Sequence, residues 1–546
     1  MLRYNKRIRF NIIESVILMV ENKSITLESL IAPTEYNIID EIEKHNSSKI
    51  ALKFISQNGE RKEISYEELI ARGNKLSNAL KKLGLKKGDR VFIMVPRMIE
   101  TYIIYFACWK AGLVIIPGSE LLRSQDILYR LNNGKVKAII SYFPFCEEIN
   151  KIINKATDLQ YKITFSESIP GWKRLEELTE NESEICNKVE TSRDDYALIT
   201  YTSGTTGQPK GVVHVHGWAY AHLRIAAIQW LDIHEGDIVW ATAGPGWQKW
   251  VWSPFLSVLG MGATGLVYLG RFNPETYLKI LDQEKVNVLC CTPTEYRLMA
   301  KVHDLTRYHL SHLQSAVSAG EALNREVIDI FQKQFNIIVR DGYGQTESTL
   351  VIGTVKGMEI RPGSMGKPIM PEFVEIVDEA GNPVKVGEQG NIALRKDFPA
   401  LFVKYYEGRV RTEKAFKGNY FVTGDLAYKD EDNYYWFVGR SDDMIISSGY
   451  TIGPFEVEDA LMQHQFVKEC AVVAHPDPIR GNVVKAFVVL KDGIEAGRHL
   501  VKELQDYVKQ LTAPYKYPRL IEFVQSLPKT DSGKIRRVEL RNKNLQ

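Results

Sequence analysis

Apolar residues recur at helix and strand periods from about residue 64 to residue 142. The segment SYEELIARGNKLSNALKKLG opens with the capping-box pair Ser65 and Glu68, repeats leucine on one helical face and ends at Gly84. This pattern predicts an amphipathic helix that starts at the serine and stops at the glycine. The apolar runs DRVFIMV, LVIIPG and KAIISY follow at strand length, and helical patterns, one of them over residues 99–111, separate them.

The same alternation recurs further along the chain and predicts the fold class. A similar order of elements runs from residue 237 to residue 343. Strands that alternate with helices form mostly parallel sheets with helices on both faces, so we expect two related α/β units. After residue 360 the segment GSMGKPIMPEFVEIVDEAGNPVKVGEQGNIALR is rich in β-branched residues, glycine and turn signals, which predicts a small β-rich segment.

The end of the chain has the pattern of a separate unit. Past FVGRSDDMIISSGY the sequence indicates a compact α+β unit of roughly a hundred residues, a usual domain size. A chain of 546 residues is too long for one hydrophobic core. We therefore expect a boundary near residues 440–443, with one domain over residues 1–440 and a second over residues 441–546.

Composition and charge narrow the class of protein. Hydrophobic residues make up 44% of the chain, charged residues 25%, and the formal net charge is +3. Nucleic-acid and membrane binding usually need a clustered basic face, which this balance does not indicate. The six cysteines form no C-x-x-C pair and no run reaches the roughly 18 apolar residues of a membrane span, so a reduced cytoplasmic location is expected.

The segment YTSGTTGQPKGVVH, residues 201–214, has the composition of a phosphate-binding loop but not the Walker spacing. Glycines without a Cβ let backbone N–H groups converge on an anion, hydroxyl groups supplement them, and a lysine adds a point charge. The alternative is a Gly/Thr-rich surface turn. The candidate phosphate ligands in this loop are Thr202, Ser203, Gly204, Thr205, Thr206, Gly207 and Lys210.

This loop resembles the signature loop of the adenylate-forming superfamily, which includes acyl-CoA synthetases, luciferases and peptide-synthetase adenylation domains. Four further stretches match in the expected order: DGYGQTES, YFVTGDLA, GRSDDMIISSGYTIGPFEVEDAL and PKTDSGKIRR. The resemblance implies a large N-terminal domain of two α/β subdomains plus the β-rich segment, followed by a small mobile C-terminal domain. It also implies that a carboxylate attacks the α-phosphate of ATP and expels pyrophosphate, a reaction catalysed mainly by positioning and charge neutralisation.

The resemblance implies roles for particular residues in this first step. The loop would hold the β- and γ-phosphates, Glu347 with Thr205 would ligate Mg²⁺, and Thr346 would contact the α-phosphate. Asp425 would accept hydrogen bonds from the ribose hydroxyls, with Arg440 nearby. Lys534 would stabilise the charge that develops at phosphorus. The remaining expected nucleotide contacts are Gly320, Glu321, Asp341, Gly342, Tyr343 and Gln345.

A second half-reaction is implied in which the thiol of coenzyme A attacks the acyl-adenylate. Asp442 resembles the hinge about which the C-terminal domain would turn. The loop residues Ser448, Gly449 and Tyr450 would then face the adenylate. Arg480, and Lys516 with Arg519, are candidates for the CoA phosphates, with surface salt bridges as the alternative. Acylation of Lys534 by a lysine acetyltransferase, reversed by a deacetylase, would remove the charge that adenylation needs.

The acid itself is only partly constrained. The C-terminal stretches resemble medium-chain acyl-CoA synthetases, and acetyl-CoA synthetases carry a tryptophan at the position of Gly344, which suggests room here for several methylenes. The segment GPGWQKWVWSPF, residues 244–255, is expected to line the same pocket, with Trp247 as its main candidate and a core aromatic ring as the alternative. Thr451, and Ser348 with Thr349, depart from the medium-chain pattern. Short, branched short, medium-chain and aromatic acids all stay open.

We therefore expect an AMP-forming acid–CoA ligase that uses ATP, Mg²⁺ and CoA. The alternative within the superfamily is an enzyme that loads a carrier protein's phosphopantetheine. A phosphotransferase is disfavoured because the chain has no Walker lysine, HRD or DFG motif. A non-catalytic binding protein on the same fold is disfavoured because the chain retains Lys534, Glu347, Asp425 and Arg440 together.

Overall fold

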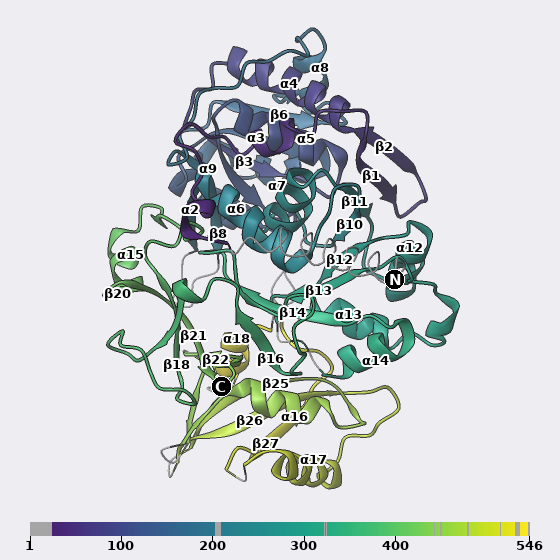
Figure 1. Cartoon of the computed structure of the whole chain (residues 1–546), viewed down its shortest axis with the longest axis vertical. Helices are drawn as coiled ribbons and strands as arrows, with labels where there is room; N and C mark the ends of the chain where they lie inside the picture. The colour runs from purple at the N-terminus through teal and green to yellow at the C-terminus, as the bar shows by residue number, and fades with distance from the viewer. Residues whose placement is uncertain are drawn as a thin grey trace, which may run out of the picture.

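The computed structural model describes residues 25–202, 209–321, 323, 325–441, 443–447, 450–477, 480–513, 515–529 and 535–543. The chain runs from an upper body that contains its first third, through a central body, to a lower body built from its last hundred residues (Figure 1). The α/β fold class predicted from the sequence is confirmed. The predicted domain boundary stays a prediction, although the lower body has its own hydrophobic clusters.

The upper body contains an eight-stranded sheet within the described residues. Its strands, in spatial order, are β19 (Lys404–Tyr405), β9 (Lys210–Val215), β8 (Tyr196–Thr202), β4 (Val114–Gly118), β3 (Arg90–Met94), β5 (Val136–Tyr142), β6 (Tyr161–Phe165) and β7 (Lys173–Arg174). From β8 to β7 the neighbours are parallel, whereas β9 and β19 are added antiparallel. The three apolar runs noted in the sequence form β3, β4 and β5, so the parallel arrangement is confirmed.

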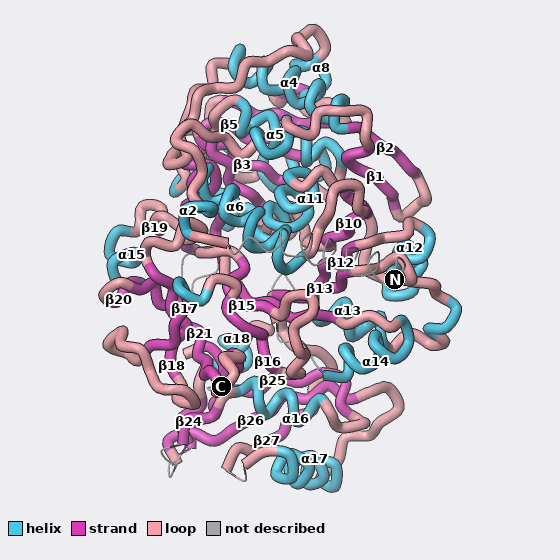
Figure 2. Tube along the Cα trace, in the orientation of Figure 1, coloured by secondary structure: helices cyan, strands magenta, loops and turns pink. Residues whose placement is uncertain are grey.

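The second sheet is larger than the pattern predicted and has fourteen strands in the described chain. They are, in spatial order, β17 (Val374–Val377), β18 (Gly390–Arg395), β21 (Tyr420–Lys429), β22 (Tyr435–Arg440), β16 (Ser364–Pro368), β15 (Leu350–Gly353), β14 (Val339–Gly344), β13 (Ser315–Ala319), β12 (Val288–Cys291), β10 (Ile238–Ala241), β11 (Thr264–Leu269), β1 (Ile50–Ser56) and β2 (Arg61–Ser65), with β20 (Phe416–Lys417) beside β21. Figure 2 shows these strands running through the middle of the molecule.

Two features of this sheet were not predicted. The β-rich segment is continuous with the second α/β unit, because β15 pairs with both β14 and β16 and β16 pairs in turn with β22. In addition, the early strand β1 crosses to this sheet and pairs parallel with β11. The pairings of β1 with β11 and of β16 with β22 join segments far apart in sequence, and a local pattern carries no signal for such contacts.

The helices cover the two sheets and join the upper body to the central body. They are α2 (Leu27–Leu30), α3 (Asp40–Glu43), α4 (Tyr66–Lys82), α5 (Ile99–Lys110), α6 (Ser124–Asn133), α7 (Cys146–Asn150), α8 (Leu175–Thr179), α9 (His216–His222), η3 (Leu223–Leu231), α10 (Gln248–Trp250), η4 (Val251–Ser257), α11 (Val258–Gly260), α12 (Pro274–Gln283), α13 (Pro293–Ala300), α14 (Arg325–Phe335) and α15 (Arg409–Ala415), with short 3₁₀ turns η1 (Phe143–Phe145), η2 (Ile153–Lys155), η5 (Leu305–Arg307) and η6 (Pro371–Phe373).

Two of these helices illustrate why the sequence folds as it does. Helix α4 begins where Ser65 accepts a hydrogen bond from the backbone of Glu68, and its leucines are buried, as predicted. Helix α5 is buried on all sides, and Tyr105 on it donates to the carbonyl of Pro245 at 3.1 Å. Because α5 also packs its aromatic rings on Trp250 and Phe255, it ties the first α/β unit to the segment that follows β10.

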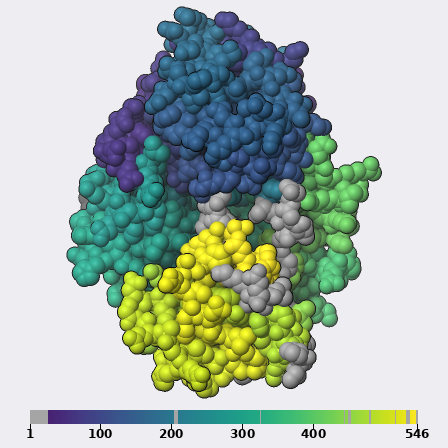
Figure 3. Space-filling view, turned by 180° about the vertical axis from the view of Figure 1, so that it is seen from behind, coloured from purple at the N-terminus to yellow at the C-terminus, as the bar shows by residue number. Residues whose placement is uncertain are grey.

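The lower body is a small α+β unit. Its elements are the hairpin β23 (Ile445–Ser447) and β24 (Tyr450–Ile452), the three-stranded sheet of β25 (Val467–Asp477), β26 (Gly481–Leu490) and β27 (Leu520–Phe523), and the helices α16 (Pro454–Met462), α17 (Arg498–Leu511) and α18 (Arg537–Lys543). Seen from behind, the end of the chain, in yellow, lies just below the blue upper body (Figure 3). The C-terminal helix therefore faces the junction between the bodies.

Candidate active site

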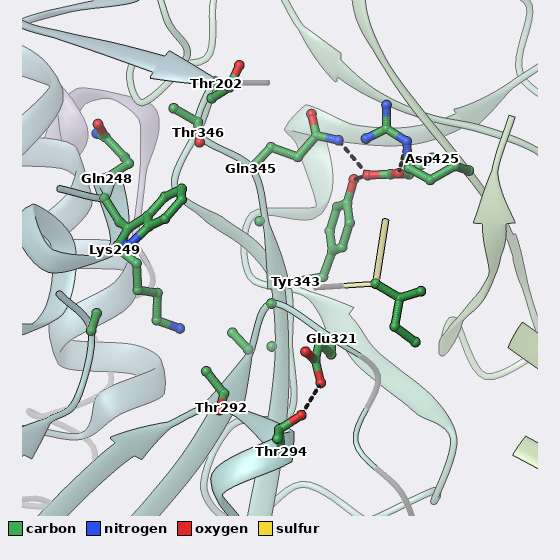
Figure 4. A pocket seen from close by; sticks show the side chains of 18 of the residues that line it. Thr202, Gln248, Lys249, Thr292, Thr294, Glu321, Tyr343, Gln345, Thr346 and Asp425 are labelled. Atoms are coloured by element: carbon green, nitrogen blue, oxygen red, sulfur yellow. Dashed lines mark hydrogen bonds and ion pairs between the residues drawn. The ribbon is translucent and has the colours of Figure 1, made fainter. Parts of the chain in front are cut away.

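A cavity of about 1430 Å³ lies where the three bodies meet. The upper body contributes the end of β8 and the start of β9, the central body contributes the end of β14, and the lower body contributes residues of α16 and α18. The carboxyl ends of parallel strands β12, β13 and β14 open onto it, which is the usual position of ligand sites in α/β sheets. Figure 4 shows side chains from these separate segments converging on the cavity.

One side of the cavity carries a hydrogen-bonded cluster centred on a buried carboxylate. Asp425 on β21 accepts a hydrogen bond of 2.6 Å from the Tyr343 hydroxyl and another from the side-chain amide of Gln345. On the neighbouring strand, Arg440 lies opposite Asp425 in register, with its Nε 3.4 Å from the carboxylate. Burial beside this carboxylate raises the pKa of Tyr343, so the phenol stays a donor. The cluster thus joins β21 and β22 to the end of β14.

A second cluster joins the start of β9 to the turn after β14. The Nζ of Lys210 lies 2.6 Å from Glu347 Oε1 and 3.0 Å from the hydroxyl of Tyr405, which itself donates to the same carboxylate oxygen at 2.9 Å. Glu347 is 5% exposed, so this ion pair is largely desolvated. Tyr405 was missed by the sequence analysis, because its position on β19 beside β9 follows only from a long-range pairing.

Buried groups behind the cavity hold the turn that carries Thr346. His214 on β9 donates from Nε2 to the carbonyl of Thr346 at 2.6 Å, and Trp218 donates to the carbonyl of Ser348 at 2.9 Å. Burial lowers the pKa of His214 to about 4, so its ring is neutral near pH 7. The turn is therefore fixed from behind by neutral donors. We call the residues of both clusters the polar wall: Lys210, Tyr343, Gln345, Glu347, Tyr405, Asp425 and Arg440.

A second part of the cavity is lined by several aromatic rings. We call it the aromatic wall: His222, Trp230, Trp247 and Trp252. Trp230 lies on η3 and Trp252 on η4, and both segments have the wide turns of π-helices, which are rare and often occur at functional sites. Pro254 lies inside η4 and removes one backbone donor there, a physical reason for the wide turn. Of this wall, the sequence pointed to Trp247 and to the segment 244–255 that includes Trp252, but not to His222 or Trp230.

His222 connects the aromatic wall to the two residues that depart from the medium-chain pattern. Its Nε2 lies 3.0 Å from the carbonyl of Trp252, which can only accept, so Nδ1 accepts the 2.6 Å hydrogen bond from the Thr349 hydroxyl. Burial lowers the pKa of His222 to about 3 and keeps the ring neutral. Ser348 and Thr349 are fully buried behind the wall. Thr349 therefore affects the cavity by orienting His222.

The expectation that Gly344 widens the cavity by lacking a ring needs correction. Gly344 does line the cavity, but a Cβ added there would lie 2.2 Å from the carbonyl oxygen of Thr349. The pairing register between β14 and β15 shifts at this residue, and the shift turns the Cβ direction into the neighbouring backbone. Glycine is needed here for close backbone approach, and the cavity size on this side depends on the aromatic wall.

Residues expected around the adenine also border the cavity. Gly320, Glu321, Asp341 and Gly342 all line it, and Glu321 accepts a 2.9 Å hydrogen bond from the hydroxyl of Thr294. Burial raises the pKa of Asp341 to about 7, although its carboxylate accepts the backbone N–H of Gly342 at 2.8 Å. Thr202, at the end of β8, lies on the same cavity.

The lower body carries two groups of predicted functional residues, one around Lys534 and one for CoA. Of the described parts of these two groups, only the segment that follows Lys534 lines the cavity. Residues 535–538 line it, directly after the segment that contains Lys534. Two ion pairs hold α18 in place: Arg537 contacts buried Glu458 at 2.7 Å, and Arg541 contacts Asp443.

The described candidates for CoA binding lie away from the cavity lining. Tyr450 is 52% exposed and stacks on Tyr515 with ring centroids 4.2 Å apart. Lys516 forms an ion pair with Glu456, and the backbone N–H of Arg480 donates to Asp477 at 2.8 Å. In this arrangement Lys516 forms a salt bridge, which is the alternative to CoA binding given in the sequence analysis. Outside the described residues lie the candidates Ser203, Gly204, Thr205, Thr206, Gly207, Asp442, Ser448, Gly449 and Lys534.

A magnesium ion is compatible with the side chains of the polar wall. No group of three or more metal-ligating side chains occurs in the described part of the chain. Mg²⁺, however, is usually held by one or two carboxylates together with substrate phosphates, and Glu347 is a buried carboxylate beside the start of β9.

Among the described residues, no helix is long and apolar enough to cross a membrane.

Comparisons with known proteins agree with this geometry. The family model described as AMP-binding enzyme matches residues 39–406, and the model of its C-terminal domain matches residues 456–534. The chain is 56% identical over 521 residues to a protein of Bacillus subtilis (strain 168) named uncharacterized acyl-CoA ligase YtcI, covering 95% of this chain and 98% of that one. It is 42% identical to the mitochondrial acyl-coenzyme A synthetase ACSM3 of Rattus norvegicus, covering 91% of this chain and 87% of that one.

The chain is also similar to solved structures that are named CoA ligases. The anthranilate CoA ligase AuaEII in complex with anthranoyl-AMP superimposes with a TM-score of 0.88 at 29% identity, over 95% of this chain and 99% of that one. A benzoate CoA ligase from Burkholderia xenovorans LB400 superimposes with a TM-score of 0.83 at 29% identity, over 93% of this chain and all of that one. The chain therefore belongs to the AMP-binding enzyme family and, within it, to the AMP-forming acid–thiol ligases.

Proposed function

We propose that this protein joins a short- to medium-chain carboxylic acid, straight or branched, to AMP with release of pyrophosphate, and then transfers the acyl group to free CoA. The observation that carries this proposal is a single cavity with a hydrogen-bonded polar wall in one part and an aromatic wall in another. The polar wall matches a nucleotide and the aromatic wall an acyl group. Aromatic acids are the second candidate class, because two similar solved structures are named anthranilate and benzoate CoA ligases.

In the first half-reaction the polar wall would bind and orient ATP. Asp425 accepts from Tyr343 and Gln345 on one oxygen, and its carboxylate would also accept hydrogen bonds from the ribose hydroxyls. Lys210, with the loop of residues 202–207, would hold the β- and γ-phosphates. Thr346 would donate to the α-phosphate, and Lys534 would neutralise the charge that develops there.

Glu347 would hold Mg²⁺, with Thr205 as the second protein ligand. When bound, the ion would offset the negative charge of the triphosphate. Lys210, which pairs with this carboxylate, would exchange it for phosphate oxygens, so the partly buried ammonium keeps an anionic partner.

The second half-reaction would need the lower body to turn about Asp442. The face next to Lys534 lines the cavity, whereas Tyr450, Arg480 and Lys516 lie elsewhere, an arrangement suited to the first half-reaction. A rotation that brings the β23–β24 hairpin, with Ser448, Gly449 and Tyr450, to the cavity would admit the pantetheine thiol. Free CoA is favoured over a carrier protein because the similar curated proteins are named acyl-CoA ligases or synthetases.

The test is pyrophosphate release with ATP and Mg²⁺ across acids from acetate to octanoate, branched acids and benzoate, each with and without CoA. CoA-dependent turnover on short- to medium-chain acids supports the proposal. Adenylate formation that responds only to a carrier protein would replace free CoA as the acceptor, and a preference for benzoate would move the acid class. Acetylated Lys534 should lose adenylation and keep thioester formation from supplied acyl-AMP, and equal loss of both would contradict its proposed role.

A further inference from the structure

Lys249 places a positive charge inside the cavity that the proposed mechanism does not use. It lies on α10 between the buried side chains of Gln248 and Trp250, and its own side chain is half-buried. Figure 4 shows the ammonium pointing into the cavity, whereas the neighbouring Gln248 points away from it. The Nζ lies 5.4 Å from the centre of the Trp230 ring, so the lysine stem follows the aromatic wall.

Two cations that line the cavity are paired with carboxylates, whereas Lys249 has no such partner in the described part of the chain. Lys210 contacts Glu347 at 2.6 Å, and Arg297 contacts Glu321 at 3.4 Å. Among the residues that the structure describes, no carboxylate lies within 4.0 Å of the Lys249 ammonium. The charge of Lys249 reaches Asp341 only through space, where it opposes the rise of the Asp341 pKa. A half-buried charge without a counter-charge is costly, and such groups concentrate at functional sites.

The surroundings of Lys249 assign it to the acyl part of the cavity. Its ring neighbour Trp230 belongs to the aromatic wall and also donates to the carbonyl of Asp341 at 3.0 Å. The charge of Lys249 acts on His222 of the same wall as well as on Asp341. The polar wall already supplies its own cations, Lys210 and Arg440, for nucleotide phosphates and ribose. A cation in an otherwise aromatic acyl pocket has no role toward a plain alkyl chain.

We propose that Lys249 selects carboxylic acids that carry a second oxygen acceptor, such as a hydroxyl, keto or second carboxylate group, away from the reacting carboxylate. The acid's far end would lie along the aromatic wall and accept a hydrogen bond from the ammonium. This inference rests on the proposed function and narrows its substrate class. A single charge-assisted hydrogen bond of this kind corresponds to roughly 10- to 100-fold in kcat/KM.

The experiment measures acid-dependent ATP–pyrophosphate exchange with three straight-chain acids of equal length: the unsubstituted acid, its ω-hydroxy derivative and the matching dicarboxylic acid. The variants are Lys249→Met, which keeps the stem against Trp230 and removes the charge, and Lys249→Arg, which keeps the charge. Lys279→Met, on the exposed face of α12, is the matched control. Melting temperature and the KM for ATP are measured for each variant.

The expected result is that the wild type uses the hydroxy or dicarboxylic acid at least as well as the unsubstituted acid. Lys249→Met should lower kcat/KM for the substituted acids by about 10- to 100-fold, leave the unsubstituted acid and the KM for ATP nearly unchanged, and be partly rescued by Lys249→Arg. An equal loss on all three acids would overturn the inference, because Lys249 would then serve the reacting carboxylate or the nucleotide. Rejection of both substituted acids by the wild type would also overturn it. Absence of exchange with every acid would overturn the proposed function as well.

Discussion

The polar wall and the aromatic wall of one cavity are built on different physical terms. The polar wall consists of side chains that hydrogen-bond to one another, as Tyr343 and Gln345 do to Asp425. The aromatic wall consists of large rings whose positions follow from the backbone, through two π-helical segments and the buried contact of His222 with Thr349. The first arrangement fixes charges and the second fixes a shape.

This difference suggests that the two walls have separate functions in the reaction. The cluster of Asp425, Tyr343 and Gln345 already holds its geometry, so it needs little reorganisation when ATP binds, which is the basis of electrostatic catalysis. Rings held by packing set the size of a pocket and contribute mainly through apolar burial. Substitutions in the polar wall should therefore affect adenylation of every acid, whereas substitutions behind the aromatic wall should change which acid is used.

Glu347→Gln tests the polar wall most severely. The substitution removes the carboxylate that pairs with Lys210 and that would hold Mg²⁺, so the rate of acyl-AMP formation should fall roughly 100- to 1000-fold with every acid. Single-turnover formation of acyl-AMP measures this rate directly. Glu359→Gln, at an exposed position, is the control. A loss confined to one acid, or smaller than about tenfold, would contradict the division between the walls.

Asp425→Asn should have the next largest effect. The amide retains the shape but loses the charge that accepts from Tyr343 and would accept from ribose, so the KM for ATP should rise about 10- to 100-fold. The KM for the acid should change little, because Asp425 belongs to the polar wall. Steady-state kinetics with each substrate varied in turn measures both constants, with Asp432→Asn as an exposed control. Equal changes in the two constants would argue against separate walls.

Asp341→Asn tests the charge of a carboxyl group that borders the cavity and belongs to neither wall. Burial raises the pKa of this carboxyl from 3.8 to about 7, so the folded chain binds its proton more tightly than the unfolded chain does. Its contribution to stability is therefore present at low pH and is lost as the pH rises from about 4 to about 7. Because asparagine cannot ionise, the melting temperature of the variant should gain on that of the wild type over this range. A difference in melting temperature between the variant and the wild type that stays constant from about pH 4 to about pH 7 would contradict the raised pKa of Asp341.

The sequence predicted the polar wall far better than the aromatic wall, and the reason is physical. Glu347, Tyr343 and Asp425 stand in short motifs, because a phosphate or ribose contact needs a particular functional group at a particular turn. Trp230 and Trp252 stand in apolar segments that look like any buried helix. Their exposure to the cavity depends on wide helical turns that the residue pattern does not predict.

The sequence likewise predicted some parts of the fold and missed others. Local periodicity predicted α4, β3, β4 and β5, since each is specified by residues a few positions apart. It did not predict the pairing of β1 with β11, nor the single sheet that joins the β-rich segment to β14. Gly344 illustrates the limit most clearly. A comparison of residue types suggests an open pocket, whereas the shifted register of β14 and β15 directs its Cβ toward the Thr349 carbonyl.

Thr349→Val should have the smallest effect and sharpens the comparison from the aromatic side. The substitution keeps the volume but removes the hydroxyl that donates to His222 Nδ1, which leaves a buried acceptor unpaired and costs about 1–3 kcal/mol of stability. The ring of His222 should then relax toward the cavity or away from it. The ratio of kcat/KM values between short and long acids should shift by several-fold, while the KM for ATP stays within about twofold.

The measurement is a chain-length profile of pyrophosphate release for the variant and for Thr157→Val, an exposed threonine that serves as the matched control. A stable variant with an unaltered profile would mean that His222 does not shape the acyl pocket. A raised KM for ATP with an unaltered profile would mean that the turn at residues 345–349 transmits the change to the polar wall instead. Only a shifted profile at constant KM for ATP supports an aromatic wall that is adjusted from behind, independently of the nucleotide.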